Sequence, residues 1–150
     1  MKQEYRSAMT INDFNLFCSS LPATTHIIQW HGSHVWKVGH KVFAVGVWNN
    51  KKYRGITFKV TETAYELLSK EPGCRPAPYF ASRGMKWIQD YAKPGLCGSD
   101  LNLYLAKSHQ LVSRGLTKKI RRELGLCQSQ DHTNTLLPRD LQLDVEWNKT

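Results

Sequence analysis

Hydrophobic and polar residues alternate with a period of two between residues 34 and 59. This alternation predicts three consecutive β-strands joined by two tight turns. Gly39-His40 suits a type II′ turn, because the first central residue of that turn needs a positive φ angle. A regular ladder around the turn places Trp36 opposite Phe43 and Lys37 opposite Val42.

The same alternation divides the strands between two faces. The predicted core face collects Trp36, Val38, Phe43, Val45, Val47, Ile56, Phe58 and Val60. The predicted opposite face carries Val35, Lys37, Val42, Ala44, Trp48, Tyr53, Thr57 and Lys59. That second face mixes cations with aromatic side chains. The polar connection at residues 49–52 should project from the sheet as a mobile, positively charged loop.

Helical spacing occurs before and after this region. Thr10 can cap a first helix, with Asp13 as its capping-box partner, that ends at Pro22. Residues 25–30 read as a first strand. A second helix begins after either Thr61 or Thr63 and ends before residue 72, where a proline-bearing loop follows.

The pattern at residues 85–91 predicts a further strand, and Ser99 or Asp100 caps a third helix. The apolar stripe of that helix consists of Leu101, Tyr104, Leu105, Ser108, Leu111 and Val112. Gly115 is predicted to end this helix as a left-handed C-cap, and Thr117 starts a short basic helix. We therefore expect a single α+β domain over residues 1–125. Residues 126–150 read as an appended tail, partly flexible, whose alternating residues 141–147 suit an edge strand or a docking segment.

The net charge of +9 is unevenly distributed along the 150 residues. No acidic residue lies between Asp13 and Glu62, a window that contains Lys37, Lys41, Lys51, Lys52, Arg54 and Lys59. A one-sided positive field attracts polyanions such as nucleic acid or an anionic membrane surface. The alternative is that the charge only keeps the protein soluble.

Signatures of catalysis and of cofactor binding are missing from the sequence. There is no phosphate-binding glycine-rich loop, no nucleophile elbow, and no pair of carboxylates on the predicted sheet. His31 and His34 are the only plausible metal pair, and they have no third ligand nearby. We expect a protein with no catalytic residue, metal or cofactor. Widely spaced cysteines, the lack of a signal peptide and the lack of an apolar span predict a cytoplasmic location with reduced thiols.

The basic-aromatic face is the candidate binding site. Lys37, Arg54 and Lys59 could contact phosphates, and Trp48 and Tyr53 could rest on sugar edges or bases. Alternatively, Trp48 and Tyr53 form an ordinary cross-strand pair with solvated lysines around them. A second group of cations, more typical of the solvated side of two helices, comprises Lys107, Arg114, Lys118, Lys119, Arg121 and Arg122.

The sequence resembles the MmcQ/YjbR family of small bacterial cytoplasmic proteins over residues 10–124, about three quarters of the chain. The resemblance rests on the segment KVGHKVFA at residues 37–44 and on Lys59, Tyr79 and Trp87. It also rests on Ser108, on Leu111-Val112 and on LTKK at residues 116–119. Two features depart from the pattern: His109 replaces the usual tyrosine after the serine, and the tail beyond residue 126 has no counterpart.

The resemblance implies a two-layer α+β fold like the bacterial frataxin homologue CyaY, with helices on one face of an antiparallel sheet. It also implies DNA binding through a double-wing arrangement. Iron binding by frataxin-like proteins uses an acidic ridge on the first helix and strand, where this chain offers only Asp13. No iron site is therefore expected.

We expect a non-enzymatic protein that binds double-stranded DNA with low sequence specificity. The predicted contact residues are Lys37, Lys41, Trp48, Lys51, Lys52, Tyr53, Arg54 and Lys59. The alternative is an interaction module that presents the same face to an acidic protein partner. A further hypothesis is that the acidic tail folds back over the basic face and competes with DNA. No membrane partner is expected, and a monomer is favoured.

Overall fold

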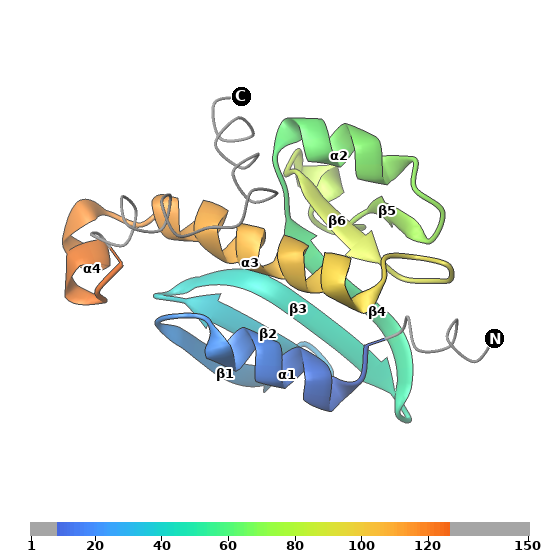
Figure 1. The fold of residues 1–150 in the computed structure, drawn as a ribbon, viewed down its shortest axis with the longest axis horizontal. Coiled ribbons are helices and arrows are strands. Elements are labelled where there is room, and N and C mark those ends of the chain that lie inside the picture. Colours follow the sequence, from blue (N-terminus) through green and yellow to red (C-terminus); the bar gives the residue numbers. More distant parts are fainter. Residues whose placement is uncertain (1–8, 127–150) are drawn as a thin grey trace.

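The computed structural model describes residues 9–126, which form a six-stranded antiparallel sheet and a layer of helices (Figure 1). The sheet has the strand order β1-β2-β3-β4-β6-β5. The elements are α1 (Ile11–Ser20), β1 (Thr24–Gln29), β2 (Ser33–Val38), β3 (Lys41–Asn49), β4 (Lys52–Lys59), α2 (Glu62–Ser69), β5 (Cys74–Pro76), the short 3₁₀ turn η2 (Ala81–Arg83), β6 (Trp87–Asp90), α3 (Gly98–Arg114) and α4 (Lys118–Glu123). The predicted α+β class is confirmed. The predictions for residues 127–150 lie outside the described part of the chain.

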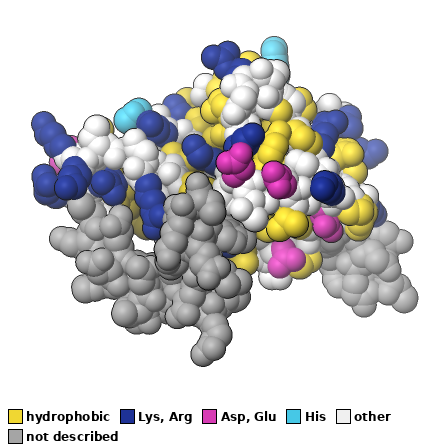
Figure 2. Space-filling view, turned by 90° about the horizontal axis from the view of Figure 1, so that it is seen from above, with side chains coloured by type: hydrophobic (Ala, Val, Ile, Leu, Met, Phe, Trp, Pro, Cys, Tyr) yellow, Lys and Arg dark blue, Asp and Glu magenta, His cyan; other side chains and the backbone are white. Residues whose placement is uncertain are grey.

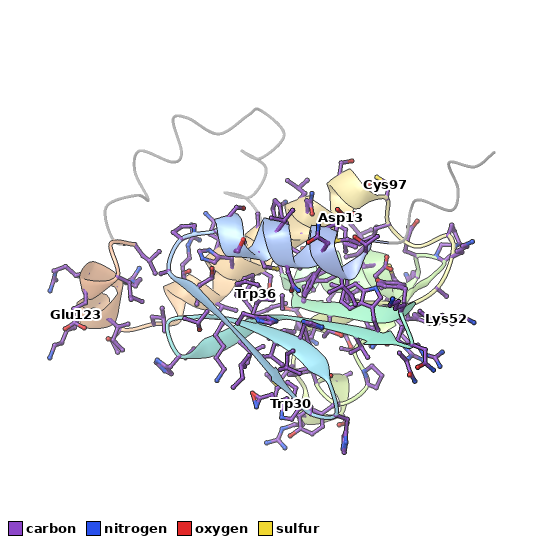
Figure 3. All side chains as sticks on the ribbon, turned by 90° about the horizontal axis from the view of Figure 1, so that it is seen from below. Asp13, Trp30, Trp36, Lys52, Cys97 and Glu123 are labelled. Carbon is purple, nitrogen blue, oxygen red and sulfur yellow. The ribbon has the colours of Figure 1, made fainter. Side chains whose placement is uncertain are left out.

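Helices α1 and α3 lie side by side on one face of the sheet, as an edge-on view shows (Figure 3). We call this the helix side and the other face the outer side. The core lies on the helix side, because burial of apolar surface there provides the main driving force for folding. Its largest fully buried side chains include Phe14, Phe43, Phe58, Ile56, Ile88, Leu101 and Leu105.

Short polar side chains set the helix boundaries. The Thr10 and Thr117 hydroxyls accept hydrogen bonds from the first turns of α1 and α4, as the sequence predicts. Of the two alternatives for α2, the structure selects Thr61, which accepts from the backbone N–H of Ala64. Helix α3 begins earlier than predicted, after Cys97. Gly115 has φ −82°, so the predicted left-handed cap is wrong: α3 ends in a right-handed turn that leads directly to α4.

Both predicted hairpin turns are tight two-residue turns. Gly39 has φ 62°, as a type II′ turn requires. A Cβ atom at Gly39 would lie 3.1 Å from a methyl carbon of Leu116, so the tip of the β2–β3 hairpin packs against the α3–α4 connection. At the other end, Asn50 and Lys51 both have positive φ angles, which gives a tight turn between β3 and β4. Strand β5 was not predicted, because three residues ending in a proline show no alternation.

Two β-bulges make the observed register differ from the predicted one. Lys37 pairs with Val42 as expected, but Trp36 pairs with Ala44, so Phe43 is an extra residue in β3. The predicted pairing of Trp36 with Phe43 is therefore wrong. In β4, Arg54 is the extra residue, because Val47 pairs with Gly55 while Trp48 pairs with Tyr53.

Each bulge reverses the alternation of side chains beyond it. Phe43 and Ala44 are consecutive in β3, and both face the helices. Each later residue of β3 therefore faces the opposite side of the sheet from the one predicted. Val45 and Val47, predicted to lie in the core, instead fall on the outer side with Val35 and Thr57. Three residues predicted to lie on the outer side, Ala44, Trp48 and Tyr53, face the helices. The predicted positions of Lys37, Thr57 and Lys59 on the outer side agree with the register.

Ser108 of α3 stabilises the bulge in β3. Its hydroxyl donates a 2.6 Å hydrogen bond to the carbonyl of Phe43 and accepts a 2.9 Å hydrogen bond from the backbone N–H of Lys59. The regular ladder between β3 and β4 ends one residue away, at the pair Ala44–Phe58. The side chain is fully buried, so it supplies partners to two groups that solvent does not reach.

We expect Ser108→Ala to lower the free energy of unfolding by about 2–4 kcal/mol, because it leaves two buried backbone groups without partners. Urea denaturation of the two proteins measures the difference. Ser113→Ala is the matched control: its hydroxyl donates only to the His109 carbonyl one turn earlier in the same helix. Equal, small losses from both substitutions would contradict the role assigned to Ser108.

Candidate nucleic-acid interface

Trp48 and Tyr53 are partly buried and pack against the core on the helix side of the sheet. The Trp48 ring lies 5.5 Å from Phe14 of α1, and its indole N–H donates to the carbonyl of Met9. Tyr53 packs edge-on against Trp48, with ring centroids 5.8 Å apart. The alternative reading of an ordinary cross-strand pair is correct for these two residues, with the pair lying on the helix side. They are removed from the candidate binding surface.

The Tyr53 hydroxyl is held by Asp90 of β6. It lies 2.7 Å from both the carbonyl oxygen and Oδ1 of Asp90, and Oδ2 accepts from the backbone N–H of Leu96. Burial raises the pKa of both Tyr53 and Asp90, although the hydrogen bonds to Asp90 oppose the shift of its carboxyl group. Burial also raises the pKa of the neighbouring Cys74 thiol to about 12. This cluster is structural: it fixes the turn after β6.

The other predicted contact residues remain available, at two separate ends of the sheet. Lys51, Lys52 and Arg54 are exposed at the β3–β4 turn, where Figure 3 labels Lys52. We call these three the β3–β4 tip. Strand β3 has nine residues, so this tip is roughly 26 Å from Lys41 at the other end of the strand.

Lys37, Lys41 and Lys59 form the second end, which we call the β2–β3 tip. The Lys41 ammonium donates a 3.3 Å hydrogen bond to the carbonyl of Gly115, and it is close enough to Lys59 to repel it. Burial lowers the pKa of the half-buried Lys59, and the charge of Lys41 lowers it further. Within residues 9–126, no carboxylate forms an ion pair with the cations of either tip.

The α3–α4 region extends the β2–β3 tip. Lys and Arg side chains gather at the end of the molecule formed by α4, on the left of Figure 2. Arg114, Lys118, Lys119 and Arg122 are exposed there, whereas Lys107 is buried. Packing of Gly39 against Leu116 and Leu124 holds α4 next to the hairpin. The second cluster, interpreted from sequence as a solvated helix surface, therefore lies beside the predicted site.

The sequence analysis missed a group of arginine–tyrosine pairs around β5 and β6. The Arg75 guanidinium lies 4.2 Å from the ring centroid of Tyr91, and that of Arg83 lies 5.5 Å from Tyr79. The alternation of Arg and aromatic residues between positions 75 and 91 is a signal in the sequence. The pattern spans two predicted elements, the proline-bearing loop and the strand at residues 85–91, so neither element alone reveals it.

His31 and His34, the pair considered as metal ligands from the sequence, do not contact each other. His34 approaches His26 of β1, with Nδ1 and Nε2 3.0 Å apart, and His31 lies exposed in the turn. In the described part of the chain, no three His, Cys, Asp or Glu side chains are arranged to hold a metal ion. None of the helices found between residues 9 and 126 has the length and apolar character needed to span a membrane.

Comparison with known proteins identifies the family. A family model described as YjbR matches residues 19–111, more than half of the chain. A crystal structure of a Deinococcus radiodurans protein with a DUF419 domain is similar, with a TM-score of 0.68 and 22% identity over 82% of this chain and 92% of that one. A protein from Pseudomonas syringae superimposes with a TM-score of 0.55 and 20% identity, over 69% of this chain and 98% of that one. These likenesses concern the fold. No curated protein matches the sequence.

Because Trp48 and Tyr53 pack against the core, we expect their substitution to affect stability and to leave nucleic-acid affinity unchanged. Trp48→Ala should cost about 2–4 kcal/mol of unfolding free energy through lost packing. Tyr53→Phe should cost about 1–2 kcal/mol, because Asp90 loses a donor. Trp30→Ala, which removes a tryptophan that is 53% exposed, is the control for the loss of ring area at the surface. If the substitutions weakened nucleic-acid binding at unchanged stability, Trp48 and Tyr53 would instead be contact residues.

We also expect the domain to lose stability as the pH falls below about 6.5, the ordinary pKa of histidine. Burial lowers the pKa of His34 and of His109, and the charge of His26 lowers that of His34 further. The folded state therefore favours the neutral form of both imidazoles. Their contribution to the free energy of unfolding is present above the pKa of histidine in the unfolded chain, and it is lost as the pH falls through the lower pKa of the folded state. Urea unfolding between about pH 7.5 and pH 5 measures this loss. His34→Gln should flatten the profile, and His40→Gln at the exposed hairpin tip should not.

Proposed function

We propose that this chain, which belongs to the YjbR family, binds the phosphate backbone of duplex DNA through its two hairpin tips and catalyses no reaction. The observation that carries the proposal is the separation of charge in the described residues. Every charged residue between Asp13 and Glu62 is a cation, and these cations lie at the two tips without a carboxylate partner. Such cations are available to an external polyanion.

The β2–β3 tip has the electrostatics of a phosphate site. Lys59 is partly desolvated and repelled by Lys41, so its charged form lacks compensation within the described residues. A phosphate oxygen between the two ammonium groups would offset both the burial and the repulsion. The exposed cations at the end of α3 and in α4 would supply further contacts beside Lys41, whose ammonium reaches the carbonyl of Gly115.

The spacing of the tips suits contacts on one side of a duplex. Their separation, roughly 26 Å along β3, is shorter than one helical turn of B-DNA, about 34–36 Å. Lysine contacts with phosphates position a protein without reading bases, so we expect little sequence preference. In this proposal, the two tips serve as the wings of the double-wing mode that the family resemblance implies. We also infer a layering like that of the frataxin homologue CyaY and a cytoplasmic location in a bacterium.

Binding to a generic duplex should depend steeply on salt. If four to six phosphates are neutralised, log K should fall against log salt with a slope of roughly −4 to −5. Fluorescence anisotropy with a labelled duplex at several salt concentrations measures the slope. Removing the three charges of the β3–β4 tip in Lys51→Ala/Lys52→Ala/Arg54→Ala should reduce its magnitude by about 2–3, since each contact contributes about 0.9.

Lys70→Ala is the control, because Lys70 is equally exposed but follows α2. Its slope should equal that of the parent chain. Failure of the parent chain to bind duplex even at low salt would overturn the proposal. If that chain then bound an acidic polypeptide such as polyglutamate through the same residues, the tips would be a protein-interaction site instead.

A further inference from the structure

We propose that β5, β6 and the loop between them form a second nucleic-acid site, which binds unpaired nucleotides by stacking bases on Tyr79 and Tyr91. This inference goes beyond the duplex proposal, because it uses other residues and another kind of contact. Tyr79 is 64% exposed and Tyr91 is 37% exposed. Each ring already has an arginine beside it, Arg83 and Arg75 respectively.

The register of the sheet places this group on the outer side. Arg75 pairs with Gln89, and its Nε donates a 2.8 Å hydrogen bond to Oε1 of Gln89. Ile88 and Asp90 face the core cluster, so Trp87, Gln89 and Tyr91 point the other way. Alternate residues of a strand are roughly 7 Å apart. Trp87 and Tyr91 therefore bracket a row roughly 13 Å long, with Arg75 next to it.

Tyr79 is joined to the same row through aromatic contacts. Phe80 stacks on Trp87 with ring centroids 4.5 Å apart and an angle of 13° between the ring planes. Tyr79 meets Phe80 edge-on at 5.5 Å, and the Tyr79 hydroxyl accepts a 3.3 Å hydrogen bond from Arg83. Phe80 thus connects the exposed Tyr79 to the buried Trp87 of β6.

The charge around this row also favours an anionic ligand. Asp90 is the only acidic residue between Glu71 and Asp100. Its carboxylate is buried on the helix side and is occupied by Tyr53 and by the N–H of Leu96. The exposed cations Arg75 and Arg83 therefore have no acidic neighbour from their own segment. A guanidinium group beside a tyrosine ring keeps donors for phosphate oxygens.

Folding does not account for the exposed rings. A side chain as exposed as Tyr79 buries little apolar area, so it adds little to stability. Aromatic rings interleaved with cations are the arrangement with which proteins hold single strands, because every unpaired base offers a π face. A duplex presents its phosphates and groove edges but keeps its bases stacked, so it cannot use this row. The ligand class is single-stranded nucleic acid, in the form of a free strand or an unpaired end.

The test compares binding of a short labelled oligothymidylate and of a hairpin duplex to the full chain by fluorescence anisotropy. Tyr79→Ala/Tyr91→Ala should weaken oligothymidylate binding by roughly tenfold or more, since stacking on each ring contributes substantially, and should leave duplex affinity unchanged. Tyr79→Phe/Tyr91→Phe keeps both rings and should bind nearly as well as the parent. Leu67→Ala, which trims a similarly exposed apolar side chain on α2, is the control and should change neither affinity.

The outcomes separate this site from the hairpin tips. The triple substitution at the β3–β4 tip should weaken duplex binding more than oligothymidylate binding. Parent chain that binds oligothymidylate but no duplex would overturn the proposed function and support this one. No binding of oligothymidylate, full binding by the double alanine variant, or a loss in the phenylalanine variant equal to that in the alanine variant would each overturn the stacking site.

Discussion

The bulge at Phe43, which the Ser108 hydroxyl holds by two hydrogen bonds, sets which residues of β3 face the helices. One hydroxyl group on α3 satisfies the carbonyl of Phe43 and the N–H of Lys59, at the point where β3 contains an extra residue. Because the bulge reverses the alternation beyond it, Ala44, Gly46 and Trp48 lie under α1 and α3. A regular β3 would turn these residues outward and expose the Trp48 ring to water. The core and the surface of the domain therefore both depend on this contact between a helix and a bulged strand.

The same reversal separates aromatic residues from cations at the hairpin tips. The rings of Trp48 and Tyr53 are used in packing, and only Lys51, Lys52 and Arg54 remain at the end of the β3–β4 hairpin. Aromatic and cationic side chains occur together elsewhere, on the outer side of β5 and β6. The surface thus offers two kinds of contact: isolated ammonium groups suited to phosphates, and arginine–tyrosine pairs suited to unpaired bases.

Much of the fold could be predicted from sequence, because turns, caps and periodicity are local signals. The Gly39-His40 turn, the Thr10 and Thr117 caps and the outward positions of Lys37 and Lys59 follow from residues close to each other in the chain. The bulges could not be predicted, since the partner that stabilises Phe43 is Ser108, 65 residues later. The errors at Val45, Val47, Trp48 and Tyr53 all result from these two extra residues. Strand β5 is an edge strand of three residues, defined only by its pairing with β6.

Backbone amide chemical shifts of the ¹⁵N-labelled chain, recorded during titration with a short duplex, test the central claim most directly. We expect the duplex to perturb the amides of both hairpin tips and of α4, with the amides of the fully buried Ile88 and Leu101 responding least. Chemical-shift perturbations that appear at both tips together, and that weaken as the salt concentration rises, would show that one polyanion contacts the two ends of β3. Shifts confined to α1 and α2, or no shifts at low salt, would contradict the assignment of the tips as the phosphate-binding surface.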